Sequence, residues 1–136
     1  MKKILLICFT TLFLTACADK EAYEQAVLAE IIDEEDVKDY NIDPEKMTKC
    51  VVDHTTEKMP GLFPFDPDRL MAYQNYTKML SMNTAEDKKK AFEELRLAFG
   101  SPKALADAHG NYTQGIMDCI TAVLAETDLT ADNEEI

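Results

Sequence analysis

The chain has no tryptophan, only four glycines and only two histidines. So little glycine leaves scant material for tight catalytic loops, and neither a phosphate-cradling glycine loop nor a Gly-x-Ser-x-Gly motif occurs. The four cysteines include no Cys-x-x-Cys pair for disulfide exchange and no Cys-x-x-Cys-His motif for haem attachment. The sequence therefore predicts a protein that is not an enzyme and that carries no cofactor.

Basic residues are also few, with 14 Lys and Arg against 26 Asp and Glu and a net charge of −12 at pH 7. Such an excess of negative charge argues against binding to nucleic acid and against close contact with anionic lipid headgroups. It favours a well-solvated surface, a basic protein partner or a bound cation. The length of 136 residues fits one small domain.

A long apolar run occurs only at residues 4–14, where it follows Lys2 and Lys3. This run is too short to span a bilayer as a helix, and it has the form of an export signal. The next residues, Leu-Thr-Ala-Cys at 14–17, resemble the lipobox of bacterial lipoproteins. The resemblance covers the first 17 residues and implies cleavage before Cys17 and attachment of palmitate-type lipid to its thiol. The alternative is an ordinary secretory signal with a chance cysteine.

The residues after Cys17 bear on which membrane holds the protein. Lipoproteins retained at the inner membrane often carry aspartate directly after the lipidated cysteine. In this chain Ala18 occupies that position, and aspartate comes one residue later, at Asp19. By the same resemblance we expect an outer-membrane anchor facing the periplasm of a Gram-negative host. The expected organisation is a signal peptide at 1–16, a short lipid-anchored tether at 17–22, a helical domain at 23–127 and an acidic, disordered tail at 128–136.

Export leaves two cysteines for the folded domain, because Cys8 lies in the signal and Cys17 carries the lipid. In an oxidising periplasm, Cys50 and Cys119 are expected to form one disulfide. Closing a loop of this length stabilises a protein by about 4 kcal/mol in the chain-entropy description. The disulfide would thus supply a large share of the stability of so small a domain.

Apolar residues recur at helical spacing along the chain, and no useful stretch alternates with the period of a strand. Asp43-Pro44 and Asp66-Pro67 have the form of helix starts, and Thr84 with Asp87 resembles a capping box. The sequence predicts an all-α bundle of about five helices in which one disulfide joins the second helix to the last. The expected helices cover residues 20–34, 43–59, 66–83, 84–99 and 101–127, with a break or bend at Gly110.

Metal binding is an alternative function. His54 and His109, together with the two remaining cysteines, have the ligand types of a zinc site, but their spacing matches no zinc pattern. Met79 and Met82 stand three positions apart on one helix face and are soft ligands for copper(I), although methionine at this spacing is also ordinary core filler. We predict no metal site, and keep a periplasmic copper, zinc or small-ligand carrier as the alternative.

Acidic and aromatic side chains gather in residues 63–76. If the aromatic rings are exposed, an acidic rim around them suits a basic protein partner; the alternative is that Phe63 and Phe65 close the bottom of the core. The candidate partner-binding residues are Phe63, Phe65, Asp66, Asp68, Tyr73 and Tyr76.

Taken together, these features predict a non-enzymatic envelope lipoprotein that binds another protein. One version is an inhibitor or immunity protein for a basic cell-wall hydrolase, and the other is an accessory subunit of an envelope assembly. Residues 112–118 (Tyr-Thr-Gln-Gly-Ile-Met-Asp) resemble a segment of helical periplasmic immunity proteins, over these seven positions alone.

Overall fold

The computed structural model describes the backbone of residues 2–134 and the side chains of residues 17–127. Within these ranges the chain forms helices and no strand, which confirms the predicted all-α fold. The elements are α1 (Lys2–Asp33), α2 (Glu35–Asp39), α3 (Pro44–Glu57), α4 (Pro67–Leu80), the 3₁₀ helix η1 (Ser81–Thr84), α5 (Lys88–Ala98) and α6 (Pro102–Glu134).

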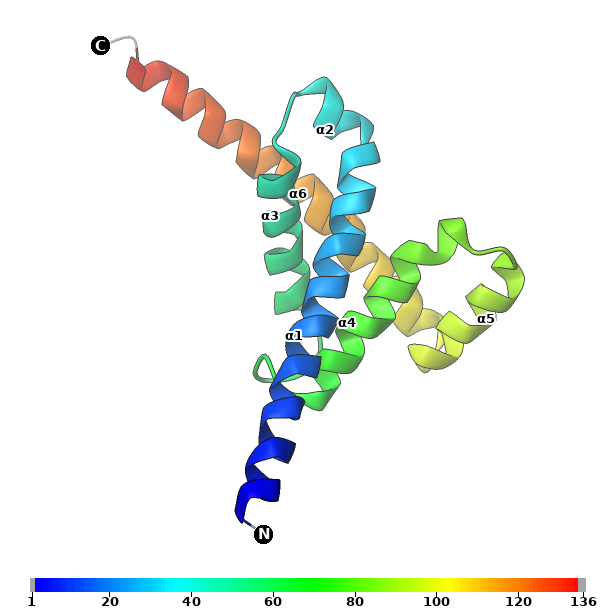
Figure 1. The fold of residues 1–136 in the computed structure, drawn as a ribbon. Helices are drawn as coiled ribbons and strands as arrows, with labels where there is room; N and C mark the ends of the chain where they lie inside the picture. Colours follow the sequence, from blue (N-terminus) through cyan, green and yellow to red (C-terminus); the bar gives the residue numbers. More distant parts are fainter. Residues whose placement is uncertain (1, 135–136) are drawn as a thin grey trace.

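Helix α1 lies at the centre of the bundle (Figure 1). Helices α3 and α4 pack against α1, and α6 packs against α3, while α5 contacts the ends of α4 and α6. The face of α1 that enters the core carries Tyr23, Val27 and Ile31, which are fully buried at the predicted helical spacing. Among the described residues, no helix is both long enough and apolar enough to cross a membrane.

Aspartate side chains begin three of the helices. Asp43 accepts a hydrogen bond from the backbone N–H of Glu45 at 2.9 Å, and Asp66 accepts one from Asp68 at 3.0 Å, which confirms both predicted N-caps. At α5 the predicted capping box is wrong. Thr84 ends η1 instead, and Asp87 caps α5 by accepting from the backbone N–H of Lys90.

The expected break or bend at Gly110 is wrong, because α6 runs through it as one helix. Residues 17–22, expected to form a lipid-anchored tether, are part of helix α1. The backbone of the expected acidic tail is helical to Glu134, and residues 135–136 lie outside the described chain. The expected linker after α1 contains the short helix α2, which buried Val37 anchors to the core.

The predicted disulfide between Cys50 and Cys119 is present and joins α3 to α6, with 5.8 Å between the two Cα atoms. Gly115 lies one helical turn before Cys119, at the same contact. A β-carbon at Gly115 would stand 3.2 Å from both Nδ1 of His54 and Cγ2 of Thr55. The missing side chain therefore lets the two helices approach closely where the disulfide holds them.

Tyr23 links α1 to both neighbouring helices. Its hydroxyl shares a 2.7 Å hydrogen bond with Oγ1 of Thr55 in α3, and its ring lies 5.8 Å from the rings of Tyr73 and Tyr76 in α4. Burial raises the pKa of the Tyr23 hydroxyl well above its ordinary value. The phenol thus stays neutral and hydrogen-bonded, as a buried hydroxyl requires.

Candidate partner-binding groove

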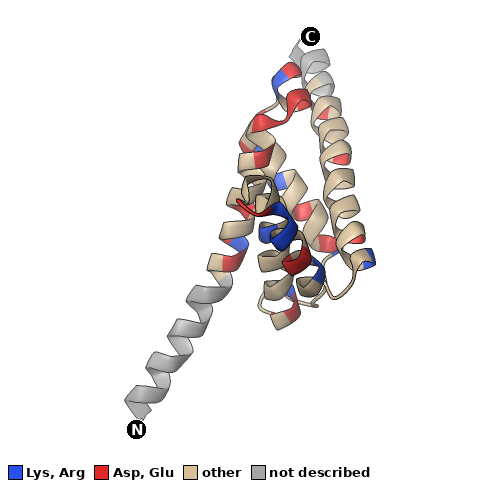
Figure 2. Cartoon of the chain, turned by 90° about the vertical axis from the view of Figure 1, so that its right-hand side faces the viewer, with Lys and Arg blue, Asp and Glu red and all other residues tan. Residues whose placement is uncertain are grey.

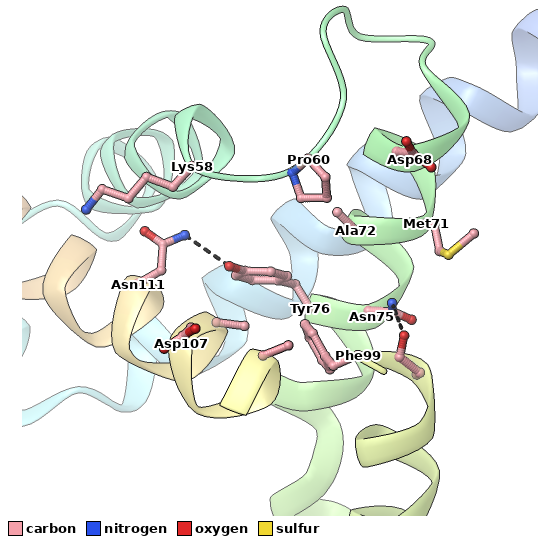
Figure 3. Close-up of a pocket in the computed structure, with 13 residues that line it drawn as sticks. Lys58, Pro60, Asp68, Met71, Ala72, Asn75, Tyr76, Phe99, Asp107 and Asn111 are labelled. Atoms are coloured by element: carbon pink, nitrogen blue, oxygen red, sulfur yellow. Dashed lines mark hydrogen bonds between the residues drawn. The ribbon is translucent and has the colours of Figure 1, made fainter. Parts of the chain in front are cut away.

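An open groove of about 560 Å³ lies where α4 and α6 meet the ends of α3 and α5 (Figure 3). Its floor is apolar and partly aromatic, and charged side chains stand at its rim. We call this the α4–α6 groove. Its apolar lining residues are Pro60, Met71, Ala72, Tyr76, Ala98, Phe99, Ala104 and Ala108, and its polar ones are Lys58, Asp68, Asn75, Asp107 and Asn111.

The aromatic floor forms because the end of α5 is fastened to α4. Nδ2 of Asn75 donates a 3.1 Å hydrogen bond to the carbonyl of Ala98, which is one of the last carbonyls of α5. This bond brings the ring of Phe99 to 5.9 Å from that of Tyr76, centroid to centroid. Gly100, with φ of +80°, then turns the chain into α6.

Arg69 fixes the wall between α3 and α4. Its guanidinium donates to the backbone carbonyls of Thr56, Pro60 and Gly61, at 2.6–2.9 Å. Gly61 makes this possible, because its φ is +96° and a β-carbon there would lie 2.7 Å from Cβ of Arg69. One side chain therefore sets the spacing between the end of α3 and the start of α4.

Asn111 ties α6 to both α3 and α4 at the side of the groove. Its Nδ2 donates to the carbonyl of Thr55 at 3.1 Å and to the hydroxyl of Tyr76 at 3.0 Å (Figure 3). Because a carbonyl only accepts, the amide must place Nδ2 on this side and Oδ1 on the other. Oδ1 of Asn111 is buried and accepts no hydrogen bond from the described residues. Asn111 therefore holds α6 against α3 and α4, and its Nδ2 faces the aromatic floor of the groove.

The groove brings together two of the six candidate partner-binding residues. Asp68 stands at its rim and Tyr76 forms part of its floor. The expectation that Tyr73 and Tyr76 belong to an exposed aromatic patch is wrong, because both pack against Tyr23 and are buried.

The other three candidates lie in the loop between α3 and α4, outside the groove. Asp66 is the N-cap of α4 and also accepts from the backbone N–H of Leu62 at 3.0 Å. Phe63 and Phe65 keep about half of their surface exposed, so they do not close the core from below.

Sequence reasoning missed Asn111, Asp107, Lys58 and Met71 as groove residues. Asn111 carried an available signal, since it follows Ala104 and Ala108 at helical spacing on α6 and is a polar residue at that position. Lys58 and Met71 carried none, because they reach the groove only through the packing of α3 and α4 around Arg69.

The candidate metal ligands are placed as follows. Within the described residues, no group of three or more His, Cys, Asp or Glu side chains is arranged to hold a metal ion. His54 is instead half-buried, with Nε2 at 3.0 Å from Oδ2 of Asp118. Met79, Met82 and His109 line another, apolar pocket of about 340 Å³, which α5 also borders through Phe92 and Leu95. A periplasmic lipoprotein that binds copper, zinc or a small ligand stays the alternative prediction.

Comparison of the chain with protein-family models, with curated proteins and with solved structures finds no match. The function proposed below therefore depends on the residues of this chain and on their arrangement.

Proposed function

We propose that this protein is a non-enzymatic lipoprotein of the bacterial envelope that binds a basic partner protein in its α4–α6 groove. Lipid on Cys17 holds the chain at the outer membrane, on the periplasmic side. The partner is a basic cell-wall hydrolase, which the protein would inhibit, or a basic subunit of an envelope assembly. The lipobox at residues 14–17 supports the anchor, and the groove supports the binding function.

The observation that carries the proposal is the combination of an aromatic floor and rim carboxylates in one groove. An arginine or lysine side chain of a partner can lay its apolar stem against Tyr76 and Phe99. Its charged end then reaches Asp68 or Asp107 at the rim. A guanidinium suits this site because its planar fork of donors matches a carboxylate in two parallel hydrogen bonds.

The rim carboxylates are free to change partners. Asp107 pairs with Lys103, four positions earlier on α6, and both side chains are largely exposed. Exposed pairs of this kind contribute about 1 kcal/mol or less, so a cation from a partner can replace Lys103 at little cost. Lys58 also lines the groove, after the end of α3, and its positive charge disfavours a second cation there.

The wider charge distribution favours the approach of a basic protein. Acidic residues gather toward the end of the bundle that carries α2 (Figure 2). The segment from Glu30 to Asp39 contains six Asp and Glu residues and one lysine. The negative electrostatic potential of these residues raises the rate at which a basic partner associates, and this effect becomes weaker as the salt concentration rises.

The test is site-specific photo-crosslinking in intact cells, with a photoreactive amino acid in place of Met71. Met71 lines the groove and is 54% exposed. Met117 is the matched control, because it is 59% exposed and does not line the groove. We expect residue 71, and not residue 117, to capture one stoichiometric partner with a basic isoelectric point.

Substitution of the rim carboxylates measures how much they contribute to the affinity for the captured partner. The double variant Asp68→Asn, Asp107→Asn should weaken binding of the captured partner about tenfold, since each exposed charge pair contributes up to about 1 kcal/mol. Equal capture at positions 71 and 117, or an acidic partner whose binding is unchanged in the double variant, would contradict the proposal.

A further inference from the structure

The loop between α3 and α4 exposes apolar side chains to an unusual degree. Leu62 is 95% exposed, Phe63 is 55% exposed and Phe65 is 52% exposed, and Pro64 completes the run. Single exposed apolar residues are ordinary on a protein surface, whereas a contiguous group in one loop is typical of a surface that meets another apolar phase.

This exposure is held in place by the fold. The Asp66 carboxylate accepts from the backbone N–H groups of Leu62 and Asp68, and both bonds hold its pKa below the ordinary value. The Arg69 guanidinium holds the start of the loop through the carbonyls of Pro60 and Gly61. Both ends of the loop are therefore fastened by hydrogen bonds, and the apolar side chains between them stay on the outside.

The loop lies at the end of the domain that carries Cys17. Nε2 of Gln74 donates to Oδ2 of Asp19 at 3.1 Å, so the middle of α4 stands level with the residues directly after Cys17. Helices α1 and α4 rise in the same general direction in Figure 1, and the α3–α4 loop lies beside the lower part of α1. At a rise of 1.5 Å per residue, the start of α4 lies about 10 Å back along its axis from Gln74. The start of α4, and the loop before it, therefore lie level with Cys17 or closer to the membrane than Cys17.

We propose that the α3–α4 loop inserts Leu62 and Phe63 into the interface of the same bilayer that holds the lipid of Cys17. The inference rests on the proposed lipid anchor, because the anchor places a membrane at this end of the domain. The acyl chains of the lipid on Cys17 hold the protein at the membrane, and the apolar loop then supplies a second membrane contact at a separate point of the domain. The occupant is a zwitterionic lipid surface, since Asp66 and Asp68 beside the loop repel anionic headgroups.

Two contacts also fix the orientation of the domain, which a single flexible anchor would not. The end that carries α2 then points away from the bilayer, and its acidic residues face the periplasm (Figure 2). The exposed apolar loop could instead contact a protein, and in that case its side chains would not enter the bilayer.

The absence of tryptophan from the chain allows a direct test. The Phe63→Trp variant is purified with its lipid and reconstituted into phosphatidylcholine vesicles, with and without brominated acyl chains. We expect its emission to shift to the blue on reconstitution and to be strongly quenched by the brominated lipid. Leu62→Trp serves as a second reporter, and it should behave in the same way.

The matched control is Tyr40→Trp, at the C-terminal end of α2, where Tyr40 is 58% exposed. Its emission should stay that of a solvated indole and should be quenched several-fold less. Lipidated protein in which the indoles at 62 and 63 are quenched no more than the indole at 40 overturns the inference. The mass of each preparation is measured separately, so a missing lipid shows failure of the anchor proposal rather than of the loop insertion.

Discussion

Replacing Cys50 and Cys119 together with alanine is expected to lower the free energy of unfolding by about 4 kcal/mol. The reason is that the disulfide joins positions 69 residues apart and so restricts the unfolded chain strongly. In a domain of this size the loss corresponds to a fall in melting temperature of roughly 15 °C. Thermal unfolding, followed by circular dichroism of the helices, measures the change.

Two comparisons show whether the disulfide itself is responsible. Reduction of the unaltered protein should lower the melting temperature nearly as far as the double substitution does. Each single alanine variant should match the double variant, because either one removes the covalent link. A double variant within about 0.5 kcal/mol of the unaltered protein, which is typical of neutral surface changes, would contradict the assigned role of the disulfide.

The second large effect is expected at Tyr23. Tyr23→Ala should destabilise the protein by about 4 kcal/mol, as large-to-small changes of buried aromatic residues do. The side chain is fully buried, and it contacts Thr55 on α3 and the rings of Tyr73 and Tyr76 on α4. Chemical denaturation of the two proteins under oxidising conditions gives the difference in free energy.

Tyr23→Phe separates the hydroxyl from the ring. It keeps the packing and removes one hydrogen bond, so the expected loss is about 1 kcal/mol. Thr55 Oγ1 retains the carbonyl of Val51 as a partner at 2.7 Å, which keeps this loss small. Tyr40→Ala, at an exposed tyrosine, should change stability by about 0.5 kcal/mol or less. Equal losses for Tyr23→Ala and Tyr40→Ala would show that Tyr23 does not organise the core.

The parts of the fold that sequence reasoning predicted depend on local chemistry or on strong periodicity. An aspartate before a proline satisfies free N–H groups at a helix start, and Asp43 and Asp66 do so in the structure. The disulfide was predictable because export leaves only Cys50 and Cys119 for the folded domain, in an oxidising compartment. Neither inference needs knowledge of tertiary packing.

The parts that could not be predicted depend on which helix faces meet. Tyr73 and Tyr76 follow Asp66 and Asp68 in the sequence, yet their rings turn inward because Tyr23 of α1 packs between them and α3. Gly110 is compatible with either a bend or a straight helix, and the neighbours of α6 decide the outcome. The α4–α6 groove takes its lining from four helices, so no single stretch of sequence contains its pattern.

The envelope location in the proposed function and the proposed membrane contact of the α3–α4 loop both depend on a lipid at Cys17. The most direct measurement is therefore the intact mass of the protein extracted from the membranes of the native host. The proposed function predicts a chain that begins at Cys17 and carries the added mass of diacylglycerol on that residue. A chain that begins elsewhere, or that begins at Cys17 with a free thiol and no lipid, would contradict it.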